Sequence, residues 1–404
     1  MAQAKSVEVA DIFRQYGSSY RERHKMPLNQ LRTMRAIERC RTQELGGHVD
    51  ECDCCGHIRI SYNSCRNRHC PKCQFLKKEK WVEQRREDIL PVPHFHIVFT
   101  IPAKLNPLAL RNKSVLYNIL FRSVCETLSE LARDPKHLGV EIGFICILHT
   151  WGQNLMDHPH IHCIVTGGGL SLDGTRWLSS RKGFFISVKV LSRLFRGKVL
   201  DYLRESWESE ELKFTGTIAE LQDPAQFSAL LKDLYCREWV VYAKPPFKDP
   251  EMLLDYLGRY THRIAIGNHR IIKMQDGGVS FLWRDYSDGN KNKIMRLHAS
   301  EFIRRFLLHV LPERFVKIRY YGLLANRNSK SMLSQCRRLL AVNVKVRNKN
   351  VTETWQEFLL RVCRIDLIKC PFCKKGRMIR KEVILPVRCN SPPLERRTWQ
   401  PSSV

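Results

Sequence analysis

Three Cys-x-x-Cys pairs constrain the fold of this chain more than any other feature of its sequence. They are Cys52–Cys55, Cys70–Cys73 and Cys370–Cys373, and they belong to a total of 16 cysteines. Each pair can form a turn that offers two sulfurs to one zinc ion, which prefers four ligands at tetrahedral corners. Such pairs within a large basic chain favour metal binding over disulfide formation. We therefore predict that part of the chain folds around zinc.

The first two pairs predict one structural Zn²⁺ site with the ligands Cys52, Cys55, Cys70 and Cys73. The 14 residues between these pairs are one fewer than the commonest zinc-ribbon spacing. Nearby side chains can replace one of these ligands, so the ligand set stays open among Cys54, Cys65, His57 and His69. The third pair would form a second site if Cys363 or Cys389 completed it.

The zinc region is expected to bind DNA. Basic side chains surround the predicted site, and those expected to grip DNA phosphates are Arg66, Arg68 and Lys72. A zinc deaminase also uses Pro-Cys-x-x-Cys, but its chemistry needs an upstream His-x-Glu that this sequence lacks. The cysteines are therefore interpreted as structural ligands.

The chain carries a large positive charge. Its 68 Lys and Arg residues exceed its 40 Asp and Glu residues, which gives a formal net charge of +28. The commonest partner for such a surplus is the phosphate backbone of a nucleic acid. No stretch approaches the roughly 20 apolar residues that span a membrane, and residues 1–14 lack the layout of a signal peptide. We expect a cytoplasmic, nucleoid-associated protein with no membrane contact.

The hydrophobic pattern predicts an α+β fold with four regions. They are basic N-terminal helices at 1–45, a zinc-binding DNA-binding domain at 46–88, a catalytic domain at 89–327, and a basic C-terminal region with the third cysteine pair at 328–404. Within the catalytic domain the sequence favours a strand at 95–101, a helix at 112–133, a hairpin from 142–150 and 160–166, and largely helical structure over 186–260.

Two histidines of the predicted hairpin are candidate ligands of a catalytic metal. His160 and His162 are two residues apart on one strand, so their imidazoles point to the same face. Gln153 ends the preceding strand, and its amide oxygen is the predicted third ligand. Three protein ligands leave positions for water and a phosphate oxygen, as a Lewis-acid site requires. His96, part of a second His-x-His pair, is expected on an adjacent strand in a supporting role.

Two tyrosines at helical spacing are candidate nucleophiles. Tyr256 and Tyr260 are four residues apart, so both phenols can lie on one face of a helix. A phenol with a pKa of about 10 becomes competent when a metal polarises the phosphate and the proton is removed. Attack would give a phosphotyrosine that stores the bond energy for rejoining. The residues expected to bind the flanking phosphates are Arg259, Arg263 and Arg270.

These motifs resemble the two-tyrosine rolling-circle transposases of the IS91 type, which belong to the HUH single-strand endonucleases. The resemblance runs from about Tyr20 to about Asn326. The stretches that carry it are Cys52 to Cys73, Phe99 to Pro102, His158 to Val165 with Gly167 to Gly169, Tyr256 to Ile264, and Phe302 to Phe306 with Leu311-Pro312.

The resemblance implies an antiparallel HUH-type sheet flanked by helices and preceded by a zinc-ribbon-like domain. It implies that His160 and His162 bind Mg²⁺ or Mn²⁺, and that Tyr256 and Tyr260 cut single-stranded DNA through 5′-phosphotyrosine intermediates. The expected partners are single-stranded DNA at the transposon ends and target DNA. The sequence has no Gly-x-x-x-x-Gly-Lys motif, so strand separation is expected from a host helicase or host replication factors.

Other functions stay open from the sequence. A replication initiator or a plasmid relaxase would use the same nicking chemistry for a different biological purpose. A zinc-ribbon regulator would bind DNA without catalysis, with both tyrosines in its core. An acidic-triad transposase would leave the histidine and tyrosine pairs without a role, and a tyrosine recombinase would need a His-x-x-Arg signature that is absent.

Overall fold

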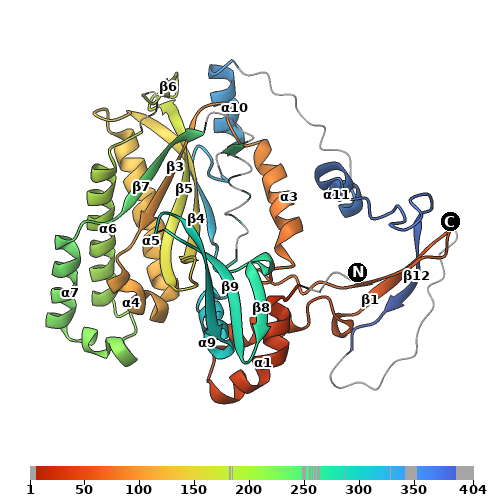
Figure 1. The fold of residues 1–404 in the computed structure, drawn as a ribbon. Helices are drawn as coiled ribbons and strands as arrows, with labels where there is room; N and C mark the ends of the chain where they lie inside the picture. The colour runs from red at the N-terminus through yellow and green to blue at the C-terminus, as the bar shows by residue number, and fades with distance from the viewer. Residues whose placement is uncertain are drawn as a thin grey trace.

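The computed structural model describes residues 6–387, except for 182, 184, 248–251, 254–255, 257, 259–260, 262–263, 287, 328 and 342–352. The described chain forms three connected parts (Figure 1). They are a central sheet with helices on both faces, a smaller helical part with its own three-stranded sheet, and a three-stranded ribbon at one side. Among the described helices, none is long and apolar enough to cross a membrane.

The central sheet has six strands, and its neighbouring strands are antiparallel. The order is β11-β4-β5-β3-β7, and β6 pairs with β5. The bounds are β3 (His94–Thr100), β4 (Val140–Trp151), β5 (Asp157–Ser171), β6 (Trp177–Ser179), β7 (Val241–Phe247) and β11 (Ile318–Gly322). The two longest strands, β4 and β5, form a hairpin whose residues are buried on both faces of the sheet.

Helices cover both faces of the central sheet (Figure 1). One face packs on α4 (Asn106–Arg111), α5 (Lys113–Arg133), α6 (Val188–Glu208) and α7 (Pro224–Cys236). The other face packs on α3 (Gln74–Arg86) and α10 (Ser329–Leu339). Because side chains alternate along a strand, Ile161 and Cys163 of β5 enter the first core, while Ile164 enters the second. The same alternation decides which face carries the polar side chains of β5.

A further core lies at the tip of the β4–β5 hairpin. It joins α1 (Val9–Arg23), α2 (Leu28–Glu38) and α9 (Ala299–Leu308) to a sheet of β8 (Ile271–Gln275), β9 (Gly278–Asp285) and β10 (Lys291–His298). The rings of Phe13 and Phe306 meet edge to face there, with centroids 5.2 Å apart. Leu155, from the turn between β4 and β5, is buried in the same core. This tip core therefore ties the N-terminal helices to the central hairpin.

The ribbon consists of β12 (Met378–Ile384), β1 (Gly47–Cys52) and β2 (Ile58–Tyr62), in that order and antiparallel throughout. Figure 1 shows it at the side of the molecule, with β12 from the end of the chain beside β1 from its beginning. The helix α11 (Trp355–Cys363) precedes β12. The short 3₁₀ helices are η1 (Gln43–Leu45), η2 (Ala103–Leu105), η3 (Gly216–Gln222) and η4 (Asn268–Arg270).

The structure confirms the predicted α+β fold with an antiparallel sheet, including the strand at 95–101, the helix at 112–133 and the hairpin. The prediction of largely helical structure over 186–260 is wrong for β7, which contains Pro245 and Pro246. The strand accepts these prolines because β7 is at the edge of the sheet, where one side needs no N–H donors. The sheet formed by β8, β9 and β10 was not predicted.

The tip core crosses the predicted region boundaries. It contains Met34 from the region 1–45, Cys70 from the region 46–88 and Phe302 from the region 89–327. These three regions therefore share the tip core, in addition to the core that the region 89–327 forms by itself.

Candidate active site and metal centres

Three histidines meet where β4 and β5 lie side by side. His149 of β4 is paired with His160 of β5, and His162 follows on the same face of β5. One ring nitrogen from each lies within 4.8 Å of the others, and we call this group the histidine cluster. His162 is paired with Ile147, which enters the core under α3 and α10. The cluster therefore lies on the sheet face that is turned away from α5.

Hydrogen bonds orient two rings of the histidine cluster. Nδ1 of His160 donates to the carbonyl oxygen of His158 over 2.6 Å. Nδ1 of His162 lies 2.8 Å from Nε2 of His96, on the neighbouring strand β3. The Nε2 atoms of His160 and His162 therefore face each other, 3.1 Å apart. Adjacent ligands of an octahedral ion with bonds of about 2.1 Å would be about 3.0 Å apart, so this pair is spaced like two metal ligands.

The structure brings His149 to the histidine cluster, whereas the sequence predicted Gln153 as the third ligand. Nε2 of Gln153 donates to Oη of Tyr286 over 3.1 Å, although Gln153 lines the same cleft as the cluster. Sequence reasoning missed His149 because a histidine at the end of an apolar strand resembles a core residue. The signal that identifies it is its place directly across the hairpin from His160, which requires the strand register.

The histidine cluster opens into a cleft with a volume of about 510 Å³. Residues that follow one another on and after β9 line it with the β4–β5 turn: Trp283, Arg284, Asp285 and Tyr286. The volume lies within the range of small-ligand sites, which is about 300–1,000 Å³. The open side of the histidine cluster therefore has room for a small ligand.

Tyr256 is connected to the histidine cluster through one imidazole. Its Oη lies 3.0 Å from Nδ1 of His96, whose Nε2 is 2.8 Å from His162. Burial lowers the pKa of His96 to about 3, so the connecting ring is neutral. The ring of Tyr256 also packs on Phe247 of β7, with centroids 4.9 Å apart. The other predicted residues of this segment lie outside the described residues: Tyr260, Arg259 and Arg263.

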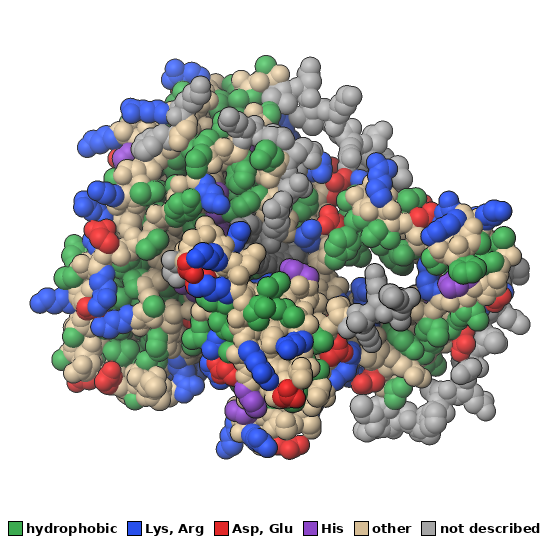
Figure 2. Space-filling model, viewed as in Figure 1, with side chains coloured by type: hydrophobic (Ala, Val, Ile, Leu, Met, Phe, Trp, Pro, Cys, Tyr) green, Lys and Arg blue, Asp and Glu red, His purple; other side chains and the backbone are tan. Residues whose placement is uncertain are grey.

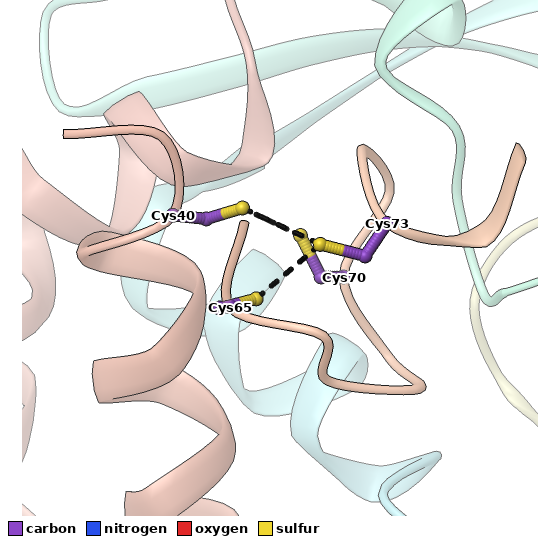
Figure 3. A group of neighbouring side chains, drawn as sticks. All are labelled: Cys40, Cys65, Cys70 and Cys73. Atoms are coloured by element: carbon purple, nitrogen blue, oxygen red, sulfur yellow. Dashed lines mark hydrogen bonds between the residues drawn. The ribbon is translucent and has the colours of Figure 1, made fainter. Parts of the chain in front are cut away.

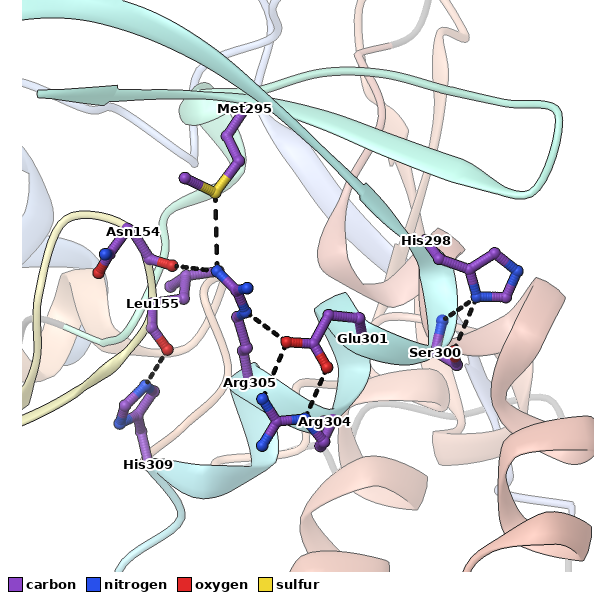
Figure 4. Close-up of polar contacts among 9 residues, drawn as sticks. All are labelled: Asn154, Leu155, Met295, His298, Ser300, Glu301, Arg304, Arg305 and His309. Carbon is purple, nitrogen blue, oxygen red and sulfur yellow. Dashed lines mark hydrogen bonds and ion pairs between the residues drawn. The ribbon is translucent and has the colours of Figure 1, made fainter. Parts of the chain in front are cut away.

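Three side chains donate hydrogen bonds to three consecutive carbonyls in the β4–β5 turn, residues 152–156. Arg270 donates to Gln153 over 2.6 Å, and Arg305 donates to Asn154 over 3.1 Å. His309 donates to Leu155 over 3.0 Å, and Figure 4 shows this contact beside that of Arg305. These donors hold the turn that sets His149 across from His160.

Leu155 adds a second restraint on the turn. It has a φ of 62°, in the left-handed region that costs a residue with a side chain roughly 1–2 kcal/mol. Complete burial of its side chain in the tip core offsets this cost. The hairpin that carries the histidine cluster is therefore anchored at its tip by packing as well as by hydrogen bonds.

Four buried or half-buried cysteines form the inner cysteine cluster: Cys40, Cys65, Cys70 and Cys73 (Figure 3). Sulfur separations within it are 3.5 to 3.6 Å. A tetrahedral zinc ion with bonds of about 2.3 Å holds its sulfurs about 3.8 Å apart, so the group is nearly of the required size. The cluster is closed by four protein ligands and packs in the tip core, as is typical of structural zinc.

A separate group is the outer cysteine cluster: Cys52, Cys55, Cys370 and Cys373. The predicted single site from Cys52, Cys55, Cys70 and Cys73 is therefore corrected, because the structure divides these two pairs between two clusters. The prediction failed because each pair finds its partners elsewhere in the chain. Of the open alternatives, Cys65 belongs to the inner cysteine cluster, and neither cluster includes Cys54, His57 or His69. Cys363 is in neither cluster, and Cys389 lies outside the described residues.

Most of the described residues predicted to grip DNA are engaged within the protein. Arg68 donates to the carbonyls of Pro312 and Phe315, and Lys72 pairs with Glu8. Arg270 holds the β4–β5 turn, as described above. Arg66 has an exposed side chain. Figure 2 shows Lys and Arg side chains spread over the visible face instead of gathered in one patch, so the positive charge is distributed.

Two known protein families match the segments of the chain that carry these clusters. Residues 12–101 match a family described as "Transposase zinc-binding domain", and this range contains the inner cysteine cluster. Residues 143–331 match a family described as "Putative transposase", and this range contains the histidine cluster and Tyr256. No solved structure matches the chain.

Two curated relatives match over most of their lengths. The chain is 50% identical over 382 residues to "Putative transposase y4qJ" of Sinorhizobium fredii, which covers 93% of this chain and 95% of that protein. It is 28% identical over 301 residues to "Transposase for insertion sequence element IS801" of Pseudomonas savastanoi pv. phaseolicola, covering 74% of this chain and 71% of that protein. At this identity and coverage the chain belongs to the IS91-type transposases, which act on the DNA of insertion sequences.

Proposed function

We propose that this transposase cuts one DNA strand with Tyr256 and keeps the cut end as a 5′-phosphotyrosine, which it then transfers to a new 3′-hydroxyl. The observation that carries the proposal is the path from Tyr256 through His96 to His162, in which a single imidazole separates the phenol from the histidine cluster. The cleft beside the cluster has room for one nucleotide and its phosphate, which favours a single strand as the substrate.

The histidine cluster is proposed to hold the catalytic divalent ion. Imidazole nitrogens are poor ligands for Mg²⁺, which prefers oxygen, whereas transition metals accept them. The donor set of three histidines therefore favours Mn²⁺ over Mg²⁺. When bound, such an ion would supply Lewis-acid polarisation of the scissile phosphate.

The hydrogen bonds around His96 suit a nucleophilic phenol. If Nε2 of His162 faces a cation, the proton of that ring is on Nδ1 and is donated to Nε2 of His96. His96 then carries its own proton on Nδ1, 3.0 Å from Oη of Tyr256. A hydrogen bond donated to the phenol oxygen favours the ionised phenol, which is the attacking form. In this arrangement His96 positions Tyr256 and holds the proton that stabilises its charge.

The proposed cleavage step balances without a further reactant. Oη of Tyr256 forms a bond to phosphorus, and the phosphorus bond to the 3′ oxygen of the preceding nucleotide breaks. The phenol proton goes to solvent, and the departing oxygen takes up a proton to become a 3′-hydroxyl. Attack by the 3′-hydroxyl of another strand reverses the step, so the phosphotyrosine supplies the energy for joining.

We also propose that Tyr260 is a second nucleophile, and that Arg259 and Arg263 bind the flanking phosphates. This part of the proposal is supported by the resemblance and by the spacing of four residues, since residues four apart lie on one face of a helix. Two nucleophiles would let one protein hold two cut ends. Strand separation would come from host replication or a helicase.

The test is incubation of the protein with single-stranded oligonucleotides that carry the element ends, in the presence of Mn²⁺, followed by denaturing gels. Oligonucleotides labelled at the 3′ end should shift to a covalent adduct with the protein, and those labelled at the 5′ end should only become shorter. The double variant Tyr256→Phe, Tyr260→Phe should form no adduct.

Tyr235→Phe is the matched control, because Tyr235 is exposed on α7, which packs on the face of the sheet away from the histidine cluster. This variant should form adduct at the parental rate. An adduct that persists in the double variant would show that another residue is the nucleophile. The absence of any adduct in the parent would instead favour a zinc-dependent DNA-binding role without catalysis.

A further inference from the structure

The outer cysteine cluster extends beyond the zinc-binding region that the family comparison recognises. That region ends at residue 101, whereas half of the cluster comes from the C-terminal part of the chain. Cys370 is 315 positions from Cys55, and Cys373 is 321 positions from Cys52. The four thiols therefore meet through tertiary structure and not through local spacing.

Both halves of the outer cysteine cluster have the same backbone geometry. The residue after the second cysteine has a positive φ in each turn, 69° at Gly56 and 59° at Lys374. Its N–H donates to the carbonyl of the first cysteine, over 3.1 Å from Gly56 to Cys52 and over 3.2 Å from Lys374 to Cys370. A positive φ has a steric cost for lysine but not for glycine. The second turn nevertheless has the same backbone shape as the first.

The sulfurs of the outer cysteine cluster are arranged for a metal and not for disulfides. Cys52 and Cys373 have sulfurs 3.7 Å apart, and those of Cys55 and Cys370 are 3.8 Å apart. A disulfide needs about 2.05 Å, whereas the sulfurs of a tetrahedral zinc site are about 3.8 Å apart. The backbone N–H of Gly376 also donates to the sulfur of Cys373 over 3.3 Å.

The backbone around the cluster brings the two turns close together. β1 pairs with β12 from Gly47 to Cys52, so the strands attached to both turns belong to one sheet. The N–H of Arg377 donates to the carboxylate of Asp53 over 2.7 Å, which joins one turn to the other. A Cβ at Gly376 would lie only 2.5 Å from the sulfur of Cys52, so this close approach requires glycine.

We propose that Cys52, Cys55, Cys370 and Cys373 bind a second structural Zn²⁺, so that one zinc ribbon is assembled from the beginning and the end of the chain. With the inner cysteine cluster, each protein would then carry two zinc ions. This inference is independent of the tyrosine chemistry. It makes the C-terminal segment a necessary part of the zinc-binding portion of the transposase.

The first test is the zinc content of the purified full-length chain, measured by elemental mass spectrometry. The parent should contain two zinc ions per chain, and the double variant Cys370→Ser, Cys373→Ser should contain one. Cys54→Ser is the matched control, because Cys54 lies between two ligands in the same turn but is outside the cluster. It should retain two ions. One zinc ion in the parent, or two in the double variant, would overturn the proposal.

A second test uses the parent protein and so does not depend on the folding of a variant. Zinc-loaded protein is treated briefly with iodoacetamide, and the modified cysteines are identified by mass spectrometry. Cys55, although exposed, should be alkylated at least about 10-fold more slowly than Cys54, because zinc-bound thiolates are protected. Cys370 and Cys373 should lose their protection together with Cys55 when a chelator removes zinc. Alkylation of Cys55 and Cys373 as fast as Cys54 in the zinc-loaded protein would contradict the proposal.

Discussion

The histidine cluster and the inner cysteine cluster are built in different ways. The histidine cluster takes its ring nitrogens from two strands of one hairpin, and it opens into a cleft. The inner cysteine cluster takes four sulfurs from separate segments, Cys40 after α2 and three cysteines before α3, and it is packed in the tip core. Three ligands with an open side suit a metal that meets a substrate, whereas four buried ligands suit a metal that holds structure.

The difference implies that the two clusters respond oppositely when a ligand is removed. The sheet that carries the histidine cluster is held by strand pairing and by two cores, so it should survive without metal. The inner cysteine cluster lies between helices whose packing it helps to define, so loss of zinc should cost stability. Activity should depend most on the first cluster, and the free energy of unfolding most on the second.

The largest effect is expected from His149→Ala. Loss of this proposed third ligand should lower Mn²⁺-dependent DNA cleavage by at least about 1,000-fold, a loss of roughly 4 kcal/mol of transition-state stabilisation. Gln153→Ala should lower the rate by less than about 10-fold, and both variants should unfold within about 2 °C of the parent. The measurement is the initial rate of adduct formation. A greater loss in Gln153→Ala than in His149→Ala would make the amide the third ligand.

The matched control for His149→Ala is His158→Ala. His158 is on the same face of β5, two residues before His160, but it is outside the histidine cluster. The carbonyl to which His160 donates is retained in this variant. A loss as large as that of His149→Ala would mean that the effect is not specific to metal ligands.

Cys70→Ser should show the opposite pattern. Removal of one buried ligand should lower the free energy of unfolding by about 3–5 kcal/mol, because the tip core loses its metal. Urea unfolding followed by fluorescence measures this change. Cys236→Ser, at an exposed cysteine on α7, should change stability by less than about 0.5 kcal/mol. Equal stability of parent and Cys70→Ser would mean that the inner cysteine cluster is not a structural metal site.

Asp157→Asn tests a buried carboxyl group of β5 that is outside the histidine cluster. Burial raises the pKa of Asp157 from 3.8 to about 7, and neither carboxyl oxygen has a hydrogen-bond partner among the described residues. Between about pH 4 and pH 7 the folded chain retains a proton that the unfolded chain has lost, so this group makes stability fall as the pH rises. At pH 8 the variant should be more stable than the parent by about 2–4 kcal/mol.

Urea unfolding at pH 4 and pH 8 tests this prediction. The difference between variant and parent should nearly vanish at pH 4, because the carboxyl group is then neutral in the folded state. The Mn²⁺ requirement should not change, because Asp157 is outside the histidine cluster and its carboxylate interacts with Lys113 of α5. A stability difference that is equal at both pH values would rule out the raised pKa.

His96→Gln tests the connection between Tyr256 and the histidine cluster. The rate of adduct formation at pH 7 should fall by about 10–100-fold, and the rate should rise more steeply with pH because the phenol loses the donor that favours its ionisation. The control is His94→Gln, on the same face of β3 two residues away. An unchanged pH profile in His96→Gln would leave His96 with a purely structural role.

The smallest effect is expected from Arg305→Ala, which removes the hydrogen bond to the carbonyl of Asn154. Stability should fall by about 1–2 kcal/mol, and cleavage should fall only a few-fold because two other donors still hold the turn. Arg304→Ala is the control, because Arg304 pairs with Glu301 on the same helix and does not contact the turn. Chemical unfolding and cleavage rates of both variants measure the difference.

Much of the fold could be predicted because it depends on local patterns. Runs of apolar residues located β3 and the β4–β5 hairpin, and the alternation of side chains along a strand placed His160 and His162 on one face. The strand β7 was not predicted because its two prolines normally indicate a break in regular structure. An edge strand accepts prolines, but the sequence does not show that β7 is at the edge of the sheet. Local patterns report local conformation, and they do not report which segments become neighbours.

The candidate site also combines features that depend on local sequence with features that depend on tertiary structure. The sequence by itself determined the His-x-His pair, the Cys-x-x-Cys turns and the excess of positive charge, because each of these depends on residues close together in the chain. Only the tertiary structure decided that His149 joins the histidine cluster and that Cys40 and Cys370 join two different cysteine clusters. Strand register and core packing choose partners over hundreds of residues, and the spacing of ligands in the sequence has no information about that choice.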